Sequence, residues 1–389
     1  MEAFVKCNNS ECLTQPRYNN IDGTDHVNGC RSRFELFRRA HPNGITKSRQ
    51  YTVKDSKNLP AVRNRSQHSV TYTLSRKETV IVEYAKDEKT DMFQIGRSSE
   101  QQIDFMVVDT WLGRSFVNNS FGPQEKLPPS TISRYACRLL IDRSPAYTAR
   151  VFAAGFDSSR NIFLGERATK WVKKSGETDG LTTNGILILH PQKDSSNDSQ
   201  FCKWYEVSVD GEIYSLRKPR SSTERGDKVE GEANILQDGT LIDLCGATLL
   251  YRTAFGLANS PTLKDLEHCL QLLNDGRPQC PVSFNTLIIP KQKASVTTIT
   301  ETQPYVYISC GHVQGYHTWG HSCNDVPKHV CPSSEIVQLC MGMEPCFHLD
   351  SESFEYAFLP CGHMASKRTV SYWSKIPMPH GTDSFYPKF

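Results

Sequence analysis

Apolar and polar residues alternate along many short stretches of this chain. Val70, Tyr72 and Leu74 alternate with polar residues, and an apolar run follows at 80–82; this period of two is typical of strands with one buried face. Similar runs occur at 103–108, 138–141, 149–153, 186–189, 205–209 and 241–250. Turn-forming residues such as Asn, Asp, Ser and Gly separate the runs. Many short strands without intervening helices predict a mainly β protein built on a β-sandwich.

One helix is predicted between the sandwich and the C-terminal part of the chain. Ser260 can cap it, and Pro261 suits its first turn. Leucines then follow at helical spacing, at Leu263, Leu266, Leu270 and Leu273. Gly276 and Pro278 end the pattern. A linker-like stretch at 291–302 precedes a region rich in Cys and His.

The N-terminal part of the chain carries a different pattern. Residues 1–30 are polar and lack a period, so we expect a mobile tail. The following stretch, Arg31–Arg39, interleaves arginines with Phe34, Leu36 and Phe37. We interpret it as an edge strand with solvated arginines, with a binding patch as the alternative.

Composition narrows the class of protein. A chain of 389 residues has room for two or three domains. Its 45 basic and 42 acidic residues are well mixed and give a net charge of only +3, whereas nucleic-acid binders usually show a one-signed patch. No run approaches the roughly 18 apolar residues of a membrane helix, and the first residues, with an early acid, do not form a secretory signal. We therefore expect a cytoplasmic protein that binds neither nucleic acid nor membrane.

The cysteines are concentrated near the C-terminal end. Six of the 14 cysteines and seven of the 12 histidines lie in the last 80 residues. Disulfides are disfavoured in a reducing compartment, so this cluster indicates metal binding. The triplet Cys310-Gly311-His312 recurs as Cys361-Gly362-His363, and aromatic residues follow each copy. Paired Cys-x-His units are uncommon and favour structural zinc.

Three short segments of the sandwich carry residues suited to phosphate. They are Gly96-Arg97-Ser98 at the end of an apolar run, Ser130-Thr131-Ile132-Ser133-Arg134 before a strand, and Thr182-Thr183-Asn184-Gly185 in a turn. A phosphate dianion favours a guanidinium fork together with neutral donors. Charge would come from Arg97 and Arg134, and neutral donors from the nearby hydroxyl groups. The candidate phosphopeptide-binding residues are Arg97, Ser98, Ser133, Arg134, Thr183 and Asn184, with Asn184 holding the peptide backbone. The alternative is that these are solvated polar loop residues.

The order and spacing of these loops resemble the forkhead-associated fold, a β-sandwich that binds phosphothreonine peptides at one end. Longer stretches resemble the Pellino family in particular, and the likeness extends over most of the chain from about residue 30. These stretches are 91–98, 153–159, 243–250, Gly315-Tyr316-His317 and Pro379-His380-Gly381-Thr382. The resemblance implies a forkhead-associated domain with an appended β wing, then a RING-like zinc domain. It also implies ubiquitination of phosphorylated kinases of the Toll and interleukin-1 receptor pathways.

The family pattern implies eight zinc ligands in four pairs, Cys-Gly-His and Cys-Pro-x-Cys, each occurring twice. Five of them are present in this sequence: Cys310, His312, Cys331, Cys361 and His363. The partner of Cys331 is replaced by Ser334 or lost in a short deletion, and the last pair is absent because the chain stops at Phe389. If the two Cys-Gly-His pairs share a metal, one zinc site is complete; if each pairs with its following Cys-Pro-x-Cys, none is. We expect at most one zinc. Cys323, Cys340, Cys346 and His348 are possible substitutes without a recognised spacing.

These patterns divide the chain into four expected parts. They are a tail at 1–30, a forkhead-associated sandwich with wing at 31–258, a helix and linker at 259–303, and a truncated RING-like zinc module at 304–389. We find no hydrolase triad, P-loop or dinucleotide fingerprint. Two hypotheses remain. One is a RING-type ubiquitin ligase that works with a ubiquitin-conjugating enzyme on phosphorylated receptor-associated kinases. The other is a phosphopeptide-binding adaptor or decoy without transfer activity.

Overall fold

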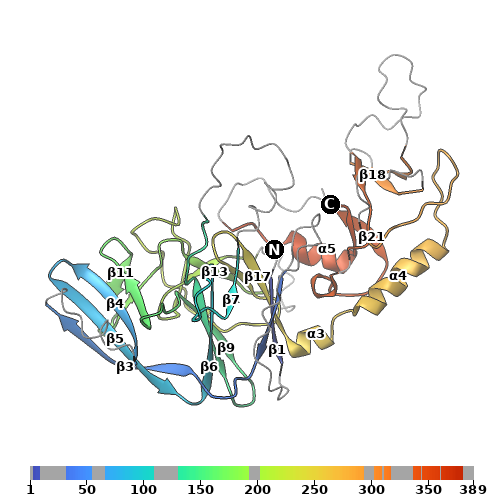
Figure 1. The fold of residues 1–389 in the computed structure, drawn as a ribbon. Helices are drawn as coiled ribbons and strands as arrows, with labels where there is room; N and C mark the ends of the chain where they lie inside the picture. Colours follow the sequence, from blue (N-terminus) through green and yellow to red (C-terminus); the bar gives the residue numbers. More distant parts are fainter. Residues whose placement is uncertain are drawn as a thin grey trace, which may run out of the picture. The chain divides into compact units, whose positions relative to one another are not determined.

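The computed structural model describes residues 3–8, 32–54, 66–108, 130–191, 202–292, 302–308, 311–316, 336–342, 344–359 and 361–379. The chain divides into two compact units, which are described separately (Figure 1). The first unit comprises Met1–Asn197 and Cys202–Ala254. The second comprises Asp198–Phe201 and Phe255–Phe389.

The first unit is built from three sheets and a hairpin. The largest sheet has the order β15 (Ile213–Tyr214), β14 (Tyr205–Val207), β13 (Ile186–Leu189), β16 (Leu241–Asp243), β17 (Thr248–Thr253), β1 (Ala3–Asn8) and β2 (Ser32–Phe37). A second sheet has the order β10 (Asn161–Leu164), β4 (His68–Ser75), β5 (Glu78–Asp87) and β3 (Gly44–Val53). A third has the order β7 (Phe105–Met106), β6 (Thr90–Gly96), β8 (Cys137–Asp142) and β9 (Ala149–Ala153). The hairpin pairs β11 (Lys170–Val172) with β12 (Thr178–Gly180).

One apolar core joins the three sheets. Side chains such as Val70 on β4, Leu139 on β8 and Ile188 on β13 are fully buried in a single cluster. The alternation in the sequence follows burial along β9, whose residues are alternately buried and half-buried. Along β4 it does not, because Ser69 and Thr71 are buried as well, with their hydroxyl groups hydrogen-bonded to Asn161 Oδ1. By contrast, all seven residues of β6 are buried. This strand lies between β8, which it pairs antiparallel, and β7, which it pairs parallel.

The prediction of a mainly β protein is confirmed, with local differences. The run at 241–250 is two strands, β16 and β17, paired antiparallel. A tight turn lies within this apolar run: Leu244 N donates to Ala247 O, and Cys245 has a φ of +67°. The run at 103–108 contains only the two-residue strand β7. The expected edge strand exists as β2 at the margin of its sheet.

Within the segment expected to be a mobile tail, the structure places a strand. β1 lies between β17 and β2 and runs parallel to both, with Val5 opposite Tyr251 and Phe34. Both partner strands are far from β1 in the sequence, so no local alternation of apolar and polar residues predicts the pairing. Residues 9–31, and the Gly-rich segment 109–129, lie outside the described residues.

The second unit combines short strands with helices. Its elements are α3 (Ala254–Ala258), α4 (Leu263–Asp275), β18 (Tyr305–Tyr307), β19 (Val313–Gln314), β20 (Ile336–Gln338), the 3₁₀ turn η2 (Pro345–Phe347), β21 (Phe354–Phe358), β22 (His363–Ser366) and α5 (Lys367–Ser374). β18 pairs with β19 and β20, while β21 pairs with β22. Leu266 and Leu270 of α4 pack in a cluster with Leu339, Phe354 and Met364. None of the helices in the described part of the chain could cross a membrane.

The predicted helix is α4, but its cap differs from the expectation. Thr262, rather than Ser260, is the N-cap residue. Its hydroxyl accepts from the Asp265 backbone N–H at 3.3 Å, and the Asp265 carboxylate accepts from Thr262 N at 2.8 Å. A reciprocal capping box requires a carboxylate or amide side chain three residues after the N-cap residue. Asp265 occupies that position relative to Thr262.

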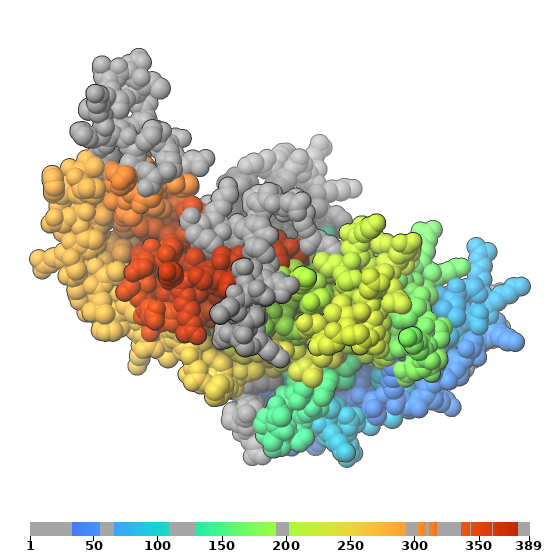
Figure 2. Space-filling view, turned by 180° about the vertical axis from the view of Figure 1, so that it is seen from behind, coloured from blue at the N-terminus to red at the C-terminus, as the bar shows by residue number. Residues whose placement is uncertain are grey.

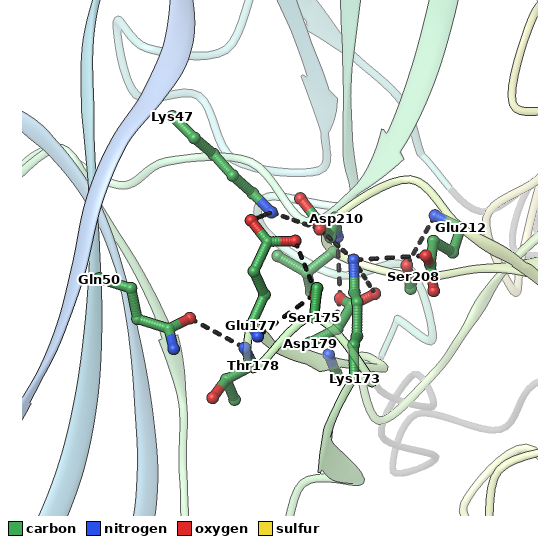
Figure 3. A network of polar contacts seen from close by, with 12 residues as sticks. Lys47, Gln50, Lys173, Ser175, Glu177, Thr178, Asp179, Ser208, Asp210 and Glu212 are labelled. Atoms are coloured by element: carbon green, nitrogen blue, oxygen red, sulfur yellow. Dashed lines mark hydrogen bonds and ion pairs between the residues drawn. The ribbon is translucent and has the colours of Figure 1, made fainter.

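A network of lysines and carboxylates joins strand β3 to the β11–β12 hairpin (Figure 3). Lys47 of β3 and Lys173, after β11, both pair with Asp210. Lys173 Nζ also lies 3.6 Å from Asp179 Oδ2 and 3.6 Å from Glu212 Oε1. Asp179 is fully buried, and burial together with the nearby Asp210 raises its pKa to about 6.

This raised pKa predicts a pH-dependent stability. The unfolded chain releases the Asp179 proton near pH 3.9, whereas the folded chain keeps it to about pH 6. The folded state therefore binds more protons in between, so stability falls as the pH rises through this window. We expect the free energy of unfolding of the parent, relative to Asp179→Asn, to fall by roughly 2–3 kcal/mol between pH 4 and 7.

The measurement is urea unfolding of both proteins across this pH range. The exposed Asp227→Asn serves as the control and should follow the parent at every pH. A constant difference between the parent and Asp179→Asn would show that Asp179 ionises alike in both states.

Candidate functional site

The loops after β6 and before β8 are joined through their backbones. Arg97 N donates to Ser133 O at 3.1 Å, and Ser98 N donates to Arg134 O at 3.2 Å. Gly96 permits this approach, because a Cβ at that position would lie 2.0 Å from the Arg134 carbonyl oxygen. A larger residue would separate the loops. Four of the six predicted binding residues therefore lie at one contact between two loops.

The Arg97 guanidinium is anchored on one side and available on the other. Its Nε donates to Ile132 O at 2.8 Å, and Ile132 itself is buried, which fixes the base of the side chain. The two terminal nitrogens make no hydrogen bond to any described residue, and the residue is exposed. This arrangement leaves a guanidinium fork for an acceptor from solution.

Arg134 is exposed beside Arg97's loop. Its guanidinium carbon lies 5.7 Å from the centre of the Tyr135 ring. The Tyr135 hydroxyl donates to Glu100 Oε1 at 2.6 Å, and this tyrosine ties the two loops together a second time. Burial and the hydrogen bond to Glu100 raise the Tyr135 pKa to about 12. The loop therefore holds its conformation at neutral pH.

The third predicted segment, the turn at 182–185, joins the same place. Asn184 Nδ2 donates to Thr131 O at 2.5 Å. Gly185 N donates to Thr182 O at 3.2 Å and so closes the turn. Gly185 has a φ of +69°, which glycine adopts without strain. Thr183 is exposed at the tip of the turn. The structure thus brings all three segments together.

Arg217 and Arg220, which sequence reasoning missed, also contact this turn. Arg217 Nη2 donates to Thr182 O at 2.9 Å, and Arg220 Nη1 donates to Asn184 O at 3.0 Å. Both come from the segment after β15, more than thirty residues further along the chain. They act on backbone carbonyls, so no side-chain motif in the sequence marks them.

In the second unit, the glycines of the two Cys-Gly-His triplets lie in similar hairpins. Gly311 lies between β18 and β19, and Gly362 lies between β21 and β22. Gly311 N donates to Tyr307 O at 2.8 Å, and Gly362 N donates to Phe358 O at 2.7 Å. The two glycines have φ values of +71° and +74°. The backbone at the two glycines therefore has the same local geometry, with His312 and His363 directly after it.

Three of the five predicted zinc ligands can be placed. His312, Cys361 and His363 lie at these two turns, whereas Cys310 and Cys331 lie outside the described residues. Cys361 Sγ donates to Phe358 O at 3.3 Å. Among the described residues, no three His, Cys, Asp or Glu side chains are grouped to hold a metal. The donor types at the turns, a thiol and an imidazole, are those that structural zinc takes.

The possible substitute ligands have other surroundings. The His348 ring nitrogens lie 3.1 Å from Glu344 O and 3.4 Å from Met364 O, so the N–H of this ring has a backbone carbonyl to donate to in either tautomer. Cys340 and Cys346 are buried. Cys323 lies outside the described residues. His348 is best explained as a packing residue.

Comparison with known proteins assigns a domain type to each part of the chain. The Pellino FHA-domain family model matches residues 16–269, and the Pellino RING-domain family model matches residues 273–388. The chain thus consists of a forkhead-associated domain followed by a RING-type domain.

Relatives cover nearly the whole chain. The "Protein pellino" of Drosophila melanogaster is 51% identical over 91% of this chain and 82% of its own length. Mouse "E3 ubiquitin-protein ligase pellino homolog 2" is 49% identical over 92% of this chain and 84% of its own length. Human "E3 ubiquitin-protein ligase pellino homolog 3" is 50% identical over 96% of this chain and 80% of its own length. The chain belongs to the Pellino family of E3 ubiquitin-protein ligases.

Proposed function

We propose that this protein is a cytoplasmic RING-type ubiquitin ligase that recognises phosphothreonine-containing kinases of Toll and interleukin-1 receptor signalling and promotes their polyubiquitination. The convergence of three loops around the free guanidinium fork of Arg97 carries the first half of the proposal. Membership of a family of E3 ligases supports the second half.

Recognition follows from the chemistry of the loops. The terminal nitrogens of Arg97 bind two oxygens of the phosphate, and Arg134 adds a second positive charge. Hydroxyl groups of Ser98, Ser133 and Thr183 donate without the desolvation that a further ion would need. Asn184 holds the peptide backbone, which gives the phosphothreonine its orientation.

The RING-type domain performs no covalent step of its own. It docks a ubiquitin-conjugating enzyme and orients the ubiquitin thioester toward a substrate lysine, so the rate comes from proximity. Cys310, His312, Cys361 and His363 would hold one zinc, which would fix the two hairpin turns as a rigid surface. Cys331, whose family partner is replaced by Ser334, would be left outside this site. We therefore propose at most one zinc per chain.

Ser334 favours a second candidate function, a phosphopeptide-binding adaptor without transfer activity. A reconstituted assay separates the two. The full chain is incubated with ubiquitin-activating enzyme, a panel of conjugating enzymes, and a substrate kinase with or without threonine phosphorylation. The proposal predicts ubiquitin chains on the phosphorylated kinase alone. Absence of product together with intact phosphopeptide binding would identify the adaptor.

Zinc content is measured on the same preparation. About one atom per chain is expected from the shared site. Two zinc atoms per chain would show that further ligands complete the second site. A zinc content of zero would show that the metal takes no part in the mechanism.

A further inference from the structure

The turn that carries Thr183 and Asn184 is held from outside by two arginines. Arg217 donates to the carbonyl oxygen of Thr182 at 2.9 Å, and Arg220 donates to the carbonyl oxygen of Asn184 at 3.0 Å. Both arginines belong to the segment after β15, which lies against the segment around residues 160–190 in the space-filling view (yellow-green and green in Figure 2). Guanidinium groups therefore fix the peptide group before Thr183 and the peptide group after Asn184.

Arg217 is itself immobilised by a buried ion pair. Its Nη2 and Nε lie 2.6 and 3.0 Å from the two carboxylate oxygens of Glu206, and the side chains are only 1% and 2% exposed. Its Nη1 donates to Ser222 O at 2.9 Å. Gly185 makes room for the pair, because a Cβ there would lie 2.5 Å from Glu206 Oε1. A bidentate pair of this kind fixes both position and direction.

Arg220 is immobilised in a comparable way by Asp243, at the end of β16. The Asp243 carboxylate also accepts from Thr248 Oγ1 and from Cys245 N, both at 3.2 Å. Because Asp243 belongs to a strand that pairs directly with β13, Arg220 ties the turn to the rigid sheet. Its side chain is 16% exposed, so this contact tolerates substitution better than the fully buried pair.

The four arginines near the loops form two groups, which differ in whether a carboxylate neutralises their charge. Glu206 and Asp243 neutralise Arg217 and Arg220, so these two fix carbonyl groups without competing for an anion. Arg97 and Arg134, in contrast, form no ion pair with any described carboxylate. Their positive charge stays available at the loops.

We infer that Arg217 and Arg220, with Glu206 and Asp243, form a carbonyl clamp that positions Thr183 and Asn184 for phosphopeptide binding. The inference rests on the proposed function. The clamp keeps the Thr183 hydroxyl and the Asn184 amide in their binding orientation before the peptide arrives. Such preorganisation removes an ordering cost that a free turn would meet on binding.

The test compares phosphothreonine-peptide affinities of the full chain by calorimetry. Arg220→Lys keeps the charge opposite Asp243 but lacks the fork that reaches the Asn184 carbonyl at the same time. We expect an affinity about tenfold lower, a shift typical of one lost charged hydrogen bond. The thermal midpoint should remain close to that of the parent. Arg225→Lys, an exposed arginine of the same segment, is the matched control and should bind like the parent.

A double variant separates positioning from a general loss of structure. If the clamp acts partly through Asn184, then Arg220→Lys causes a smaller loss in a chain that already carries Asn184→Ala than it does in the parent. Additive losses, or unchanged affinity in Arg220→Lys, would overturn the clamp while leaving the phosphopeptide site in place. A parent chain that does not bind the peptide would overturn the proposed function as well.

Asp243→Asn gives a second approach if Arg220→Lys does not fold. It removes the charge that holds Arg220, so we again expect an affinity about tenfold lower. Affinity equal to that of the parent would contradict the clamp.

Discussion

Arg97→Ala is expected to weaken binding of a phosphothreonine peptide by two to three orders of magnitude. The variant removes two charge-assisted hydrogen bonds to the phosphate, worth roughly 3–4 kcal/mol together. It also removes the bond from Arg97 Nε to Ile132 O, which positions the second loop. Calorimetry with phosphorylated and unphosphorylated forms of one peptide measures the effect.

Two further variants distinguish charge from geometry. Arg97→Lys retains the charge but not the fork, so most of the loss should remain. Arg76→Ala removes an exposed arginine from the turn between β4 and β5 and should bind like the parent. If Arg97→Ala binds the phosphopeptide as tightly as the parent, then the phosphate lies elsewhere.

Gly362→Ala is expected to destabilise the second unit strongly, whereas Gly311→Ala should have a smaller effect. Both glycines have positive φ values, and alanine there costs about 1–2 kcal/mol. The alanine Cβ at position 362 would in addition lie 1.8 Å from Gln338 O of β20, while at position 311 it meets no atom of the described residues within 4 Å. Displacing the β20 backbone brings the expected loss at Gly362 to roughly 3 kcal/mol or more.

Hydrogen exchange provides the measurement for this pair of variants. The amide of Met364, which donates to Cys340 O at 2.8 Å, should lose protection in Gly362→Ala and keep it in Gly311→Ala. Equal protection in the two variants would mean that the second triplet is not held against β20.

Local patterns predicted the loops of the site because each has its own chemical signature. Gly96-Arg97-Ser98 and Asn184-Gly185 place a charged or polar side chain next to a glycine that the backbone needs. Strand β9 could likewise be predicted, since its residues alternate between buried and half-buried. In β4 the alternation marked a strand but not its burial, because Ser69 and Thr71 are as buried as Val70 and Tyr72. The candidate recognition residues and their placement in loops could therefore be predicted from the sequence.

Contacts between distant segments could not be predicted in this way. β1 pairs in parallel with strands that begin about 30 and 245 residues further along the chain, and its short pattern does not reveal them. Arg217 and Arg220 bind carbonyl groups, which every residue has. Arg138 is similar: it is buried in the core because its guanidinium donates to the carbonyls of Ala153, Ala154 and Val209. Long-range partners of this kind appear only once the fold is known.

A crystal structure of the full chain with a phosphothreonine peptide would show directly where the phosphate binds. We expect its oxygens to lie within hydrogen-bond distance of the Arg97 terminal nitrogens. We also expect the Thr183 hydroxyl to donate to the phosphate and Asn184 to contact the peptide backbone. A peptide bound to another face, with Arg97 open to solvent, would show that these loops are not the phosphopeptide site.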